Sequence, residues 1–285
     1  MSEFAEQLIS WQAAHGRHDL PWQGARDPYR IWLSEIMLQQ TQVATVIPYY
    51  LRFLQDFPDI QSLARAGEDH VLARWSGLGY YSRARHLHAA ARHIVEQYGA
   101  RFPQEVEKLQ ALPGIGRSTA AAIAAFAFGA QVAILDGNVK RVLTRYFGIS
   151  GYPGDKRVEA ALWQQATALL PARGIERYTQ ALMDFGATLC TRSNPQCLAC
   201  PLSSRCVAHR DGRVHELPTP KPRAPLPQRE TVMLVLRHDN KLLLEKRPAR
   251  GIWSAETTRF RPPSLAAYKA LSAAPMRSFL VTWIS

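Results

Sequence analysis

The sequence lacks a long apolar run. No stretch approaches the roughly 20 consecutive apolar residues that a membrane-spanning helix requires, although 47% of the 285 residues are hydrophobic. The N-terminus MSEFAEQLISW also lacks a signal-peptide pattern. We therefore expect a cytoplasmic protein that does not bind membranes. Its length and apolar content suffice for roughly two domains with hydrophobic cores.

Acidic residues are scarce relative to basic ones. There are 35 Lys and Arg against 23 Asp and Glu, a formal net charge of +12, and the isoelectric point is about 9.9. This balance predicts a polyanionic partner. Charge alone does not separate nucleic-acid binding from attachment to a membrane surface or from a merely solvated basic surface.

Cysteine is absent outside one short segment, which holds Cys190, Cys197, Cys200 and Cys206. Without a signal sequence, a secreted disulfide framework is disfavoured. Gaps of six, two and five residues bring four thiolates close together, and four thiolates suit either zinc or an iron–sulfur cluster. The residue types by themselves leave both open.

The rest of the chain is arranged around residues 112–138, LPGIGRSTAAAIAAFAFGAQVAILDGN. The turn at 112–116 has two glycines that allow close backbone approach. It leads into a predicted alanine-rich helix over 117–128, which Gly129 can end in the left-handed conformation. The free N–H groups at the start of that helix suit an anion such as a DNA phosphate, although a lone GxG turn is weak evidence.

A second helix is predicted to begin after Asp136, whose commonest role there is to cap it. Together, LPGIGRSTA and the later LDGNVKRV resemble the helix-hairpin-helix DNA glycosylases, in which this Asp is the signature acid. The resemblance implies DNA contacts from the hairpin residues Leu112, Gly114, Gly116, Arg117 and Ser118.

Asp27-Pro28 predicts the start of an earlier helix, followed by SEIMLQQTQVATVIPYY at 34–50. Glu35, Gln39 and Gln42 recur at helical spacing, which for a lone Glu usually marks a solvated face. The whole segment, however, resembles adenine DNA glycosylases of the MutY kind. The resemblance implies that Glu35 is the general acid and that Trp22 lines the substrate pocket. The same resemblance brings three residues against the DNA stack: Gln39, Gln40 and Thr41.

The motif GLGYYSRAR at 77–85 resembles a second motif of the same family. By that resemblance Tyr80 wedges beside the base opposite the adenine. Aromatic rings next to Arg83 and Arg85 combine base stacking with phosphate neutralisation. The order of the cysteine gaps likewise matches the 4Fe–4S loop of the endonuclease III and MutY glycosylases, and implies a 4Fe–4S cluster held by all four cysteines.

The expected fold is mostly α: two helical lobes of a helix-hairpin-helix glycosylase, with the active site in the cleft between them. The resemblance implies a six-helix barrel with the hairpin over 26–135 and an iron–sulfur cluster domain from 1–25 and 136–212. Residues 213–229, rich in proline and basic residues, predict a stiff linker. Residues 230–285 begin as a β-hairpin with strands over 231–236 and 241–245. There the family has a Nudix-like α/β domain, of which we expect only a part, since the resemblance ends after Trp253.

Cleavage of an N-glycosidic bond to adenine requires a general acid near the base and an anion near the sugar C1′. Glu35 fits the acid, because desolvation in a cleft would raise its pKa, and Asp136 fits the anion. Asn138 would position Asp136 or the incoming nucleophile. The adenine must be flipped out of the duplex. We expect a monomer acting on double-stranded DNA with adenine opposite 8-oxoguanine or guanine.

Three other functions compete with this one. Pyrimidine-lesion glycosylases with lyase activity resemble the chain closely, but they carry Lys where Ser118 stands, and serine cannot form their imine. A non-catalytic iron–sulfur DNA-binding protein would not need Glu35 or Asp136 in their motifs. A Nudix hydrolase would need an acidic helix downstream of the hairpin, and the sequence has none.

Overall fold

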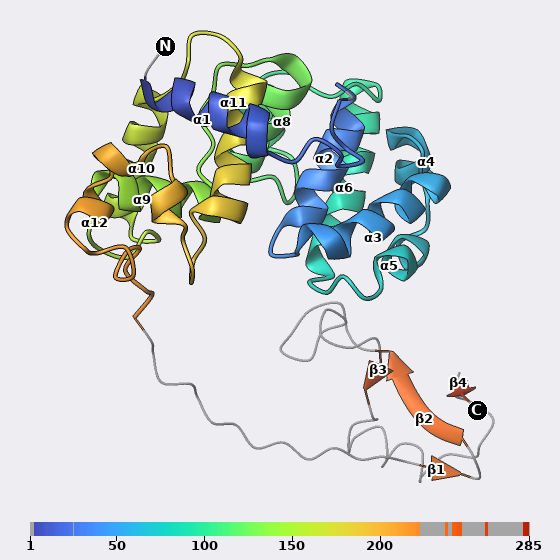
Figure 1. Cartoon of the computed structure of the whole chain (residues 1–285). Helices are drawn as coiled ribbons and strands as arrows, with labels where there is room; N and C mark the ends of the chain where they lie inside the picture. The colour runs from blue at the N-terminus through green and yellow to red at the C-terminus, as the bar shows by residue number, and fades with distance from the viewer. Residues whose placement is uncertain are drawn as a thin grey trace. The chain divides into compact units, whose positions relative to one another are not determined.

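The computed structural model describes residues 3–24 and 26–222, and beyond them the backbone of four short strands. From residue 3 to 222 the described chain is helical (Figure 1). Its α-helices are α1 Glu3–His15, α2 Pro28–Leu38, α3 Val43–Asp56, α4 Ile60–Arg65, α5 Glu68–Trp75, α6 Ser82–Tyr98, α7 Val106–Gln110, α8 Arg117–Phe128, α9 Gly137–Phe147, α10 Lys156–Ala168, α11 Ile175–Asp184 and α12 Val207–Arg210. A π-helix, η1 Phe185–Leu189, continues α11, and two 3₁₀ turns follow at Cys197–Ala199 and Ser203–Arg205.

Local capping explains where the helices around the site begin and end. The Asp27 side chain accepts a hydrogen bond from the Tyr29 N–H at 2.9 Å, with Pro28 as the first residue of α2. Gly129 ends α8 in the left-handed conformation, with φ of 68°. The Asp136 side chain accepts from the Val139 N–H at 2.7 Å and caps α9. These predicted boundaries are confirmed.

One helical prediction is wrong. Glu35, Gln39 and Gln42 were expected on a single helix face, but α2 ends at Leu38 and Gln39 is its C-cap. Gln40 has φ of 56°, a left-handed conformation that cannot continue the helix. The chain therefore turns away from the helix axis, and only Glu35 of the three residues lies on α2.

One hydrophobic core joins α1 to α8, α9, α10 and α11. Trp11 of α1 meets the Phe185 ring edge to face at a centroid distance of 5.1 Å, and Phe4 meets Tyr146 at 4.8 Å. The first helix thus packs against segments more than a hundred residues later in the chain. Figure 1 shows α1, α9 and α10 gathered on one side, α2 to α6 on the other, and α8 between the two groups.

Aromatic side chains fill the interior of the second group of helices. Trp32, Tyr50, Phe53, Phe57 and Trp75 are all at most 2% exposed. Phe53 contacts both Phe57 and Trp75, at ring-centroid distances of 4.8 and 6.2 Å. Large buried rings fill the space between α2, α3 and α5, and so support the helix that carries Glu35.

The predicted linker is in part packed onto the helices. Val214 and Leu217 are buried against Ala208, and the Leu217 carbonyl accepts a hydrogen bond from Arg145 Nε at 2.8 Å. Residues 213–217 therefore belong to the helical unit, because two apolar side chains in this proline-rich segment bury themselves. Residues 223–229 of the predicted linker lie outside the described residues.

The strands belong to a second compact unit. Strand β2 (Lys241–Lys246) pairs antiparallel with β1 (Arg237–His238), β3 (Phe260–Arg261) and β4 (Thr282–Ile284). The predicted strand at 241–245 is confirmed, and its described antiparallel neighbour on the N-terminal side is Arg237–His238, which follows the predicted range 231–236. Residues 231–236, predicted as the first strand, lie outside the described residues.

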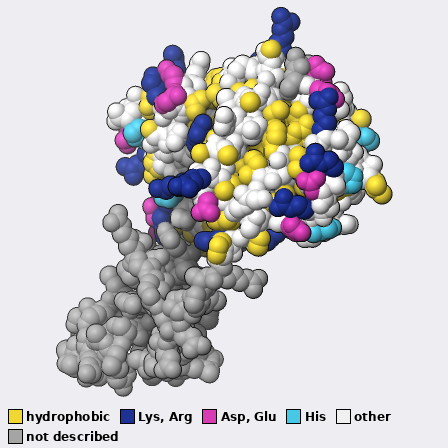
Figure 2. Space-filling model, turned by 90° about the vertical axis from the view of Figure 1, so that its left-hand side faces the viewer, with side chains coloured by type: hydrophobic (Ala, Val, Ile, Leu, Met, Phe, Trp, Pro, Cys, Tyr) yellow, Lys and Arg dark blue, Asp and Glu magenta, His cyan; other side chains and the backbone are white. Residues whose placement is uncertain are grey.

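On one face of the helical unit, the described basic side chains do not form a separate patch (Figure 2). Figure 2 shows one face, turned by 90° from the view of Figure 1, on which basic and acidic side chains are interspersed around an apolar area. Among the residues that the structure describes, no helix is both long and apolar enough to cross a membrane.

Candidate active site and DNA-binding surface

A cleft with about 750 Å³ of free volume passes beside α2 and α11. This volume is within the range of small-molecule sites, about 300–1,000 Å³, and suits a flipped nucleotide. Its lining includes Arg17, Trp22, Ser34, Glu35, Gln180 and Met183. The cleft therefore brings together Glu35 and Trp22, two residues predicted for the substrate site. The Trp22 side chain is buried and packs edge to face on Tyr50, at a centroid distance of 5.3 Å.

Glu35 is held as a protonated acid near neutral pH. Burial in the cleft wall and, to a smaller extent, the negative charge of Asp136 together raise its pKa from 4.5 to about 8. The influence of Asp136 shows that the two carboxyl groups, 101 residues apart in sequence, lie close enough to affect each other, although Asp136 is not among the residues that line the cleft. A neutral carboxylic acid beside an apolar cleft is suited to donate a proton to a bound base.

Asp136 stands at the start of α9, where opposing effects act on its carboxyl group. Burial raises its pKa, and this effect exceeds the lowering effect of hydrogen bonds from the Val139 and Asn138 N–H groups and of the charges of Arg141 and Lys140. The helix N-terminus does favour the ionised form, as the sequence predicts. Desolvation nevertheless makes the net direction upward.

Asn138 is linked to the cysteine-containing segment through Arg141. Arg141 Nη2 donates to Asn138 Oδ1 at 2.9 Å and to the Gly186 carbonyl at 2.6 Å, and its Nε donates to the Cys190 carbonyl at 2.8 Å. A Cβ on Gly186 would lie 2.6 Å from the Asn138 Cβ. Glycine is therefore required in the π-helix η1 for α9 to approach this closely.

Arg17, which lines the cleft, forms an ion pair with the buried Asp184 behind it. Asp184 is fully buried on α11, and its carboxylate accepts from Arg17 Nε at 2.7 Å and from the Arg17 N–H at 3.1 Å. Gln180 Nε2 donates to the same carboxylate at 3.0 Å. Removal of Arg17 would leave the Asp184 charge buried without a partner, which is strongly destabilising. The loop after α1 is thereby anchored to α11 beside the nucleotide-sized cleft.

The predicted hairpin forms a tight turn in front of α8. Gly114 has φ of 75°, and a Cβ there would lie 2.6 Å from the His86 Cβ, so both conformation and space require glycine. Leu112 and Ile115 are buried and anchor the turn to the hydrophobic interior. Gly116 precedes α8 and leaves the first N–H groups of that helix without a side-chain cap.

The first two residues of α8 are held by neighbours outside the hairpin. The Arg117 guanidinium lies 3.8 Å from the centre of the Trp163 ring, a cation–π contact. Ser118 Oγ accepts a hydrogen bond from the Leu135 N–H at 2.9 Å. Ser118 thus fixes the residue just before Asp136, a role that the sequence did not indicate.

The residues predicted to approach the DNA stack adopt an unusual backbone. Gln40 and Tyr80 have φ values of 56° and 46°, and both are exposed, Tyr80 by 59%. For residues other than glycine such conformations cost on the order of 1–3 kcal/mol and gather at functional sites. Gln39 is half-buried and its Nε2 donates to Thr119 Oγ1 at 3.4 Å. Arg83, predicted to contact phosphate, is instead only 8% exposed.

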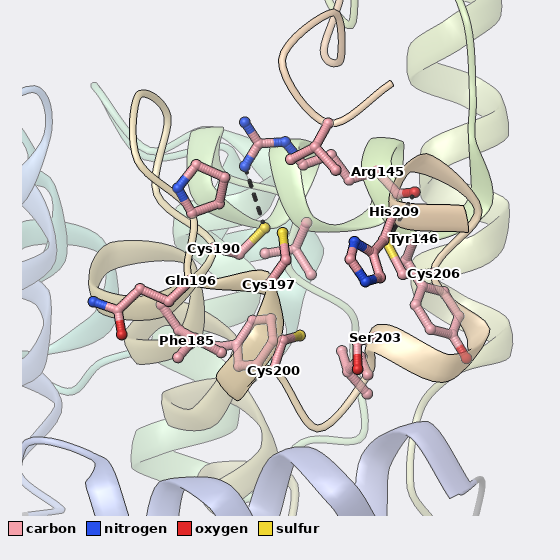
Figure 3. A pocket seen from close by; sticks show the side chains of 15 residues that line it. Arg145, Tyr146, Phe185, Cys190, Gln196, Cys197, Cys200, Ser203, Cys206 and His209 are labelled. Carbon is pink, nitrogen blue, oxygen red and sulfur yellow. Dashed lines mark hydrogen bonds between the residues drawn. The ribbon is translucent and has the colours of Figure 1, made fainter. Parts of the chain in front are cut away.

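All four cysteines line one cavity between α9, η1 and α12, as Figure 3 shows. Arg145, itself buried, donates to Cys190 Sγ at 3.4 Å and to the Thr191 carbonyl at 2.6 Å. Burial raises the pKa of Cys197 and Cys206, and that of Cys200 to about 12. In the described residues no three His, Cys, Asp or Glu side chains converge on a single ion. Four thiols spread around a cavity fit a group of several atoms better than one zinc ion.

The family model of the HhH-GPD superfamily base excision DNA repair proteins matches residues 33–167. An adenine DNA glycosylase of Buchnera aphidicola subsp. Acyrthosiphon pisum is 40% identical over 250 residues, which are 88% of this chain and 71% of that protein. The chain belongs to the adenine DNA glycosylase family. It is a DNA glycosylase, a hydrolase of base-excision repair. The human adenine DNA glycosylase is 45% identical over 220 residues, which are 74% of this chain and 40% of the human protein.

Solved structures agree on the fold of this glycosylase. A thermostable thymine-DNA glycosylase superposes with a TM-score of 0.67 at 31% identity, over 73% of this chain and 95% of its own. An endonuclease III–DNA complex superposes with a TM-score of 0.62 at 20% identity, and so shows the fold alone. The predicted helix-hairpin-helix glycosylase fold is confirmed. Since relatives of this fold act on different bases, the fold itself does not choose the base.

Several residues around the site were not predicted from the sequence. Arg17, Asp184 and Arg141 look like ordinary surface charges in the sequence, and the only signal for Arg141 is its position three residues after Asn138. Trp163 looks like one apolar position of an amphipathic helix. Arg17 reaches the cleft, Asp184 reaches Arg17, and Trp163 reaches Arg117 only through tertiary packing.

Proposed function

We propose that this glycosylase hydrolyses the N-glycosidic bond of adenine mispaired with 8-oxoguanine or guanine in double-stranded DNA. The observation that carries the proposal is the pair Glu35 and Asp136. Glu35 lines a nucleotide-sized cleft, and burial together with the Asp136 charge raises its pKa to about 8. A protonated Glu35 as the acid, with the Asp136 carboxylate as the anion near the sugar, would give the division of labour that glycoside cleavage needs.

The reaction follows from these two groups. Glu35 donates its proton to a ring nitrogen of the flipped adenine, the C1′–N9 bond breaks, and its electron pair leaves with the base. The electron-poor sugar is stabilised by the Asp136 carboxylate, through a covalent bond to C1′ that water later displaces. Glu35, now ionised, takes the proton of that water. Asn138, held by Arg141 at 2.9 Å, keeps Asp136 or the water in line.

We propose that Gln40 and Tyr80 enter the base stack at the mispair, with Tyr80 beside the base opposite the adenine. Their exposure and left-handed backbone support this role. The hairpin turn and Arg117 bind phosphate on the adenine-containing strand. Gln39 and Thr41 support the wedge from either side. Hydrophobic or aromatic wedges that unstack a base step are a general way to open duplex DNA.

We propose that Cys190, Cys197, Cys200 and Cys206 hold a 4Fe–4S cluster. The four thiols around one cavity, with Arg145 at hydrogen-bond distance of Cys190 Sγ, fit such a group. The cluster would supply a covalent template for residues 190–206. No step of the base removal requires its electrons.

The two-lobe division remains our proposal, with residues 26–135 forming the six-helix barrel and residues 1–25 and 136–212 the cluster lobe. The core shared by α1 and α9 to α11 supports the second lobe. We also propose that the glycosylase acts as a monomer. The β-strands beyond residue 236 would belong to the partial Nudix-like domain.

The test uses duplexes with adenine opposite 8-oxoguanine, guanine or thymine, incubated with the full chain and then with alkali to reveal abasic sites. We expect cleavage at the adenine opposite 8-oxoguanine and guanine, and none opposite thymine. A thymine:guanine duplex is the control for the other base specificity that this fold carries. Excision of thymine there, with adenine left intact, would refute the proposal.

A further inference from the structure

Arg83, on the first turn of α6, is directed into the protein. Its guanidinium Nη1 donates to the main-chain carbonyls of Ile36, Met37 and Gln39 at 3.1, 2.9 and 2.6 Å. Nη2 donates to Thr41 Oγ1 at 3.1 Å and to the Leu78 carbonyl at 3.3 Å. The guanidinium also lies 5.3 Å from the centre of the Trp75 ring. Only 8% of the residue is exposed, and these contacts stabilise the guanidinium charge inside the helical unit.

The carbonyls that Arg83 binds are those that the end of a helix leaves without partners. Ile36 and Met37 lie in the last turn of α2, whose carbonyls have no partner further along the helix. A cation there is favoured by the helix dipole. Arg83 therefore caps α2 from another helix, at a point 46 residues away in sequence from Met37.

Both chain segments that Arg83 holds carry a strained, exposed residue. Gln40 lies between two Arg83 partners, Gln39 and Thr41. Tyr80 lies in the short connection between Leu78, another partner, and Arg83 itself. Gln40 and Tyr80 share the left-handed backbone. A strained conformation persists only where its surroundings hold it, and the Arg83 guanidinium is common to both.

We propose that Arg83 is a positioning residue that sets Gln40 and Tyr80 for entry into the DNA stack, and does not itself bind phosphate. The inference rests on the proposed wedge function of those two residues. A planar fork with several fixed donors is needed to serve five acceptors in two segments, which the single point charge of lysine does not provide. Arginine should thus not be replaceable by lysine, although the charge is the same.

A direct phosphate contact makes the opposite prediction. Each phosphate neutralised by a side chain contributes about one to the slope of log affinity against log salt concentration. Under that hypothesis Arg83→Gln lowers the slope by about one, and Arg83→Lys keeps it. Under ours, both variants keep the slope of the parent protein, because no counterion is displaced by Arg83.

The experiment measures wedge insertion apart from catalysis. Arg83→Lys and Arg83→Gln are made in the full chain with Glu35→Gln, and bound to a duplex carrying 2-aminopurine next to the mispaired adenine. We expect binding with an unchanged salt slope but a loss of the fluorescence increase that reports unstacking. In proteins that keep Glu35, single-turnover excision should fall about 100-fold for both variants, as for misplaced groups in general. Arg92→Gln, an exposed residue of the same helix that pairs with Glu96, is the charge control and should change neither readout.

Further variants distinguish our inference from simple instability and from failure of the wedge proposal. Thr41→Val removes one acceptor of Arg83 without removing a charge. This variant should also reduce unstacking, and it serves as the test if the Arg83 variants fold poorly. Gln40→Ala and Tyr80→Ala should each reduce unstacking, and neither should add to Arg83→Lys. Normal unstacking in Gln40→Ala and Tyr80→Ala would refute the wedge proposal. If those two are impaired while Arg83→Lys is normal, or if the salt slope falls by about one in Arg83→Gln, the positioning role of Arg83 is wrong.

Discussion

The pH dependence of base excision follows from the position of Glu35. Burial and the Asp136 charge raise its pKa from 4.5 to about 8, and the proposed acid must be protonated when adenine leaves. The single-turnover rate should therefore be independent of Glu35 ionisation below about pH 8. Above it the rate should fall about tenfold per pH unit, and at pH 9.5 it should be about 30-fold below the plateau. With an ordinary Glu pKa, the protonated fraction at pH 7 would already be about 300-fold lower.

The same pKa predicts a cost in stability. The folded-state pKa lies above the unfolded value, so the neutral carboxyl group contributes stability below pH 4.5 that is lost as pH rises toward about 8. One pKa unit corresponds to about 1.4 kcal/mol, so the loss reaches roughly 4–5 kcal/mol. Glu35→Gln does not titrate. The variant should melt at a higher temperature than the parent at pH 8.5, and the difference should vanish near pH 4.5.

The assay is single-turnover excision from the adenine:8-oxoguanine duplex between pH 6 and 9.5, with DNA affinity measured at each pH as the control. Glu35→Gln should lower the rate by about 10²–10⁴-fold and abolish the alkaline limb. A parent rate that stays flat to pH 9.5 would show that Glu35 is not the acid. The same conclusion would follow if Glu35→Gln retained the limb.

Three further predictions concern the surroundings of the two carboxyl groups. The purified protein should be brown and hold about four irons, and Cys197→Ser should lose iron and DNA affinity together; a colourless, zinc-loaded and fully active protein contradicts the cluster. Borohydride should not trap the protein on DNA, because Ser118 has no amine for an imine; efficient trapping would favour a lyase. Trp163→Leu should weaken DNA binding by about 0.5–1 kcal/mol but have no effect once Arg117→Gln is present; equal effects in both backgrounds would mean that the ring acts elsewhere.

Short-range features of this glycosylase are readable in the sequence. Asp27 and Asp136 cap the starts of α2 and α9, and Gly129 ends α8. These positions can be predicted because capping depends on a few neighbouring atoms. The spacing of the cysteines brings all four to one cavity, since they lie within one short segment. The family motifs that resemble adenine DNA glycosylases are also local, and the comparisons confirm that family.

Other features arise only when distant segments meet. The residues of the Arg17–Asp184 ion pair are 167 positions apart, and those of the Arg83–Met37 hydrogen bond 46. No local pattern distinguishes these arginines from solvated ones. Sequence spacing likewise predicted one helix through Gln42, whereas α2 ends at Leu38 and Gln40 adopts a left-handed backbone.

The sequence by itself predicted the starts of α2 and α9, the end of α8 and the hairpin, because these depend on local backbone preferences and on motifs. Only the tertiary structure decided the direction of the Glu35 pKa, since this pKa depends on burial and on a charge 101 residues away. Only the tertiary structure also turned Arg83 inward, because most acceptors of its guanidinium lie more than 40 residues away in the chain, in residues 36–41, and only Leu78 is close in sequence.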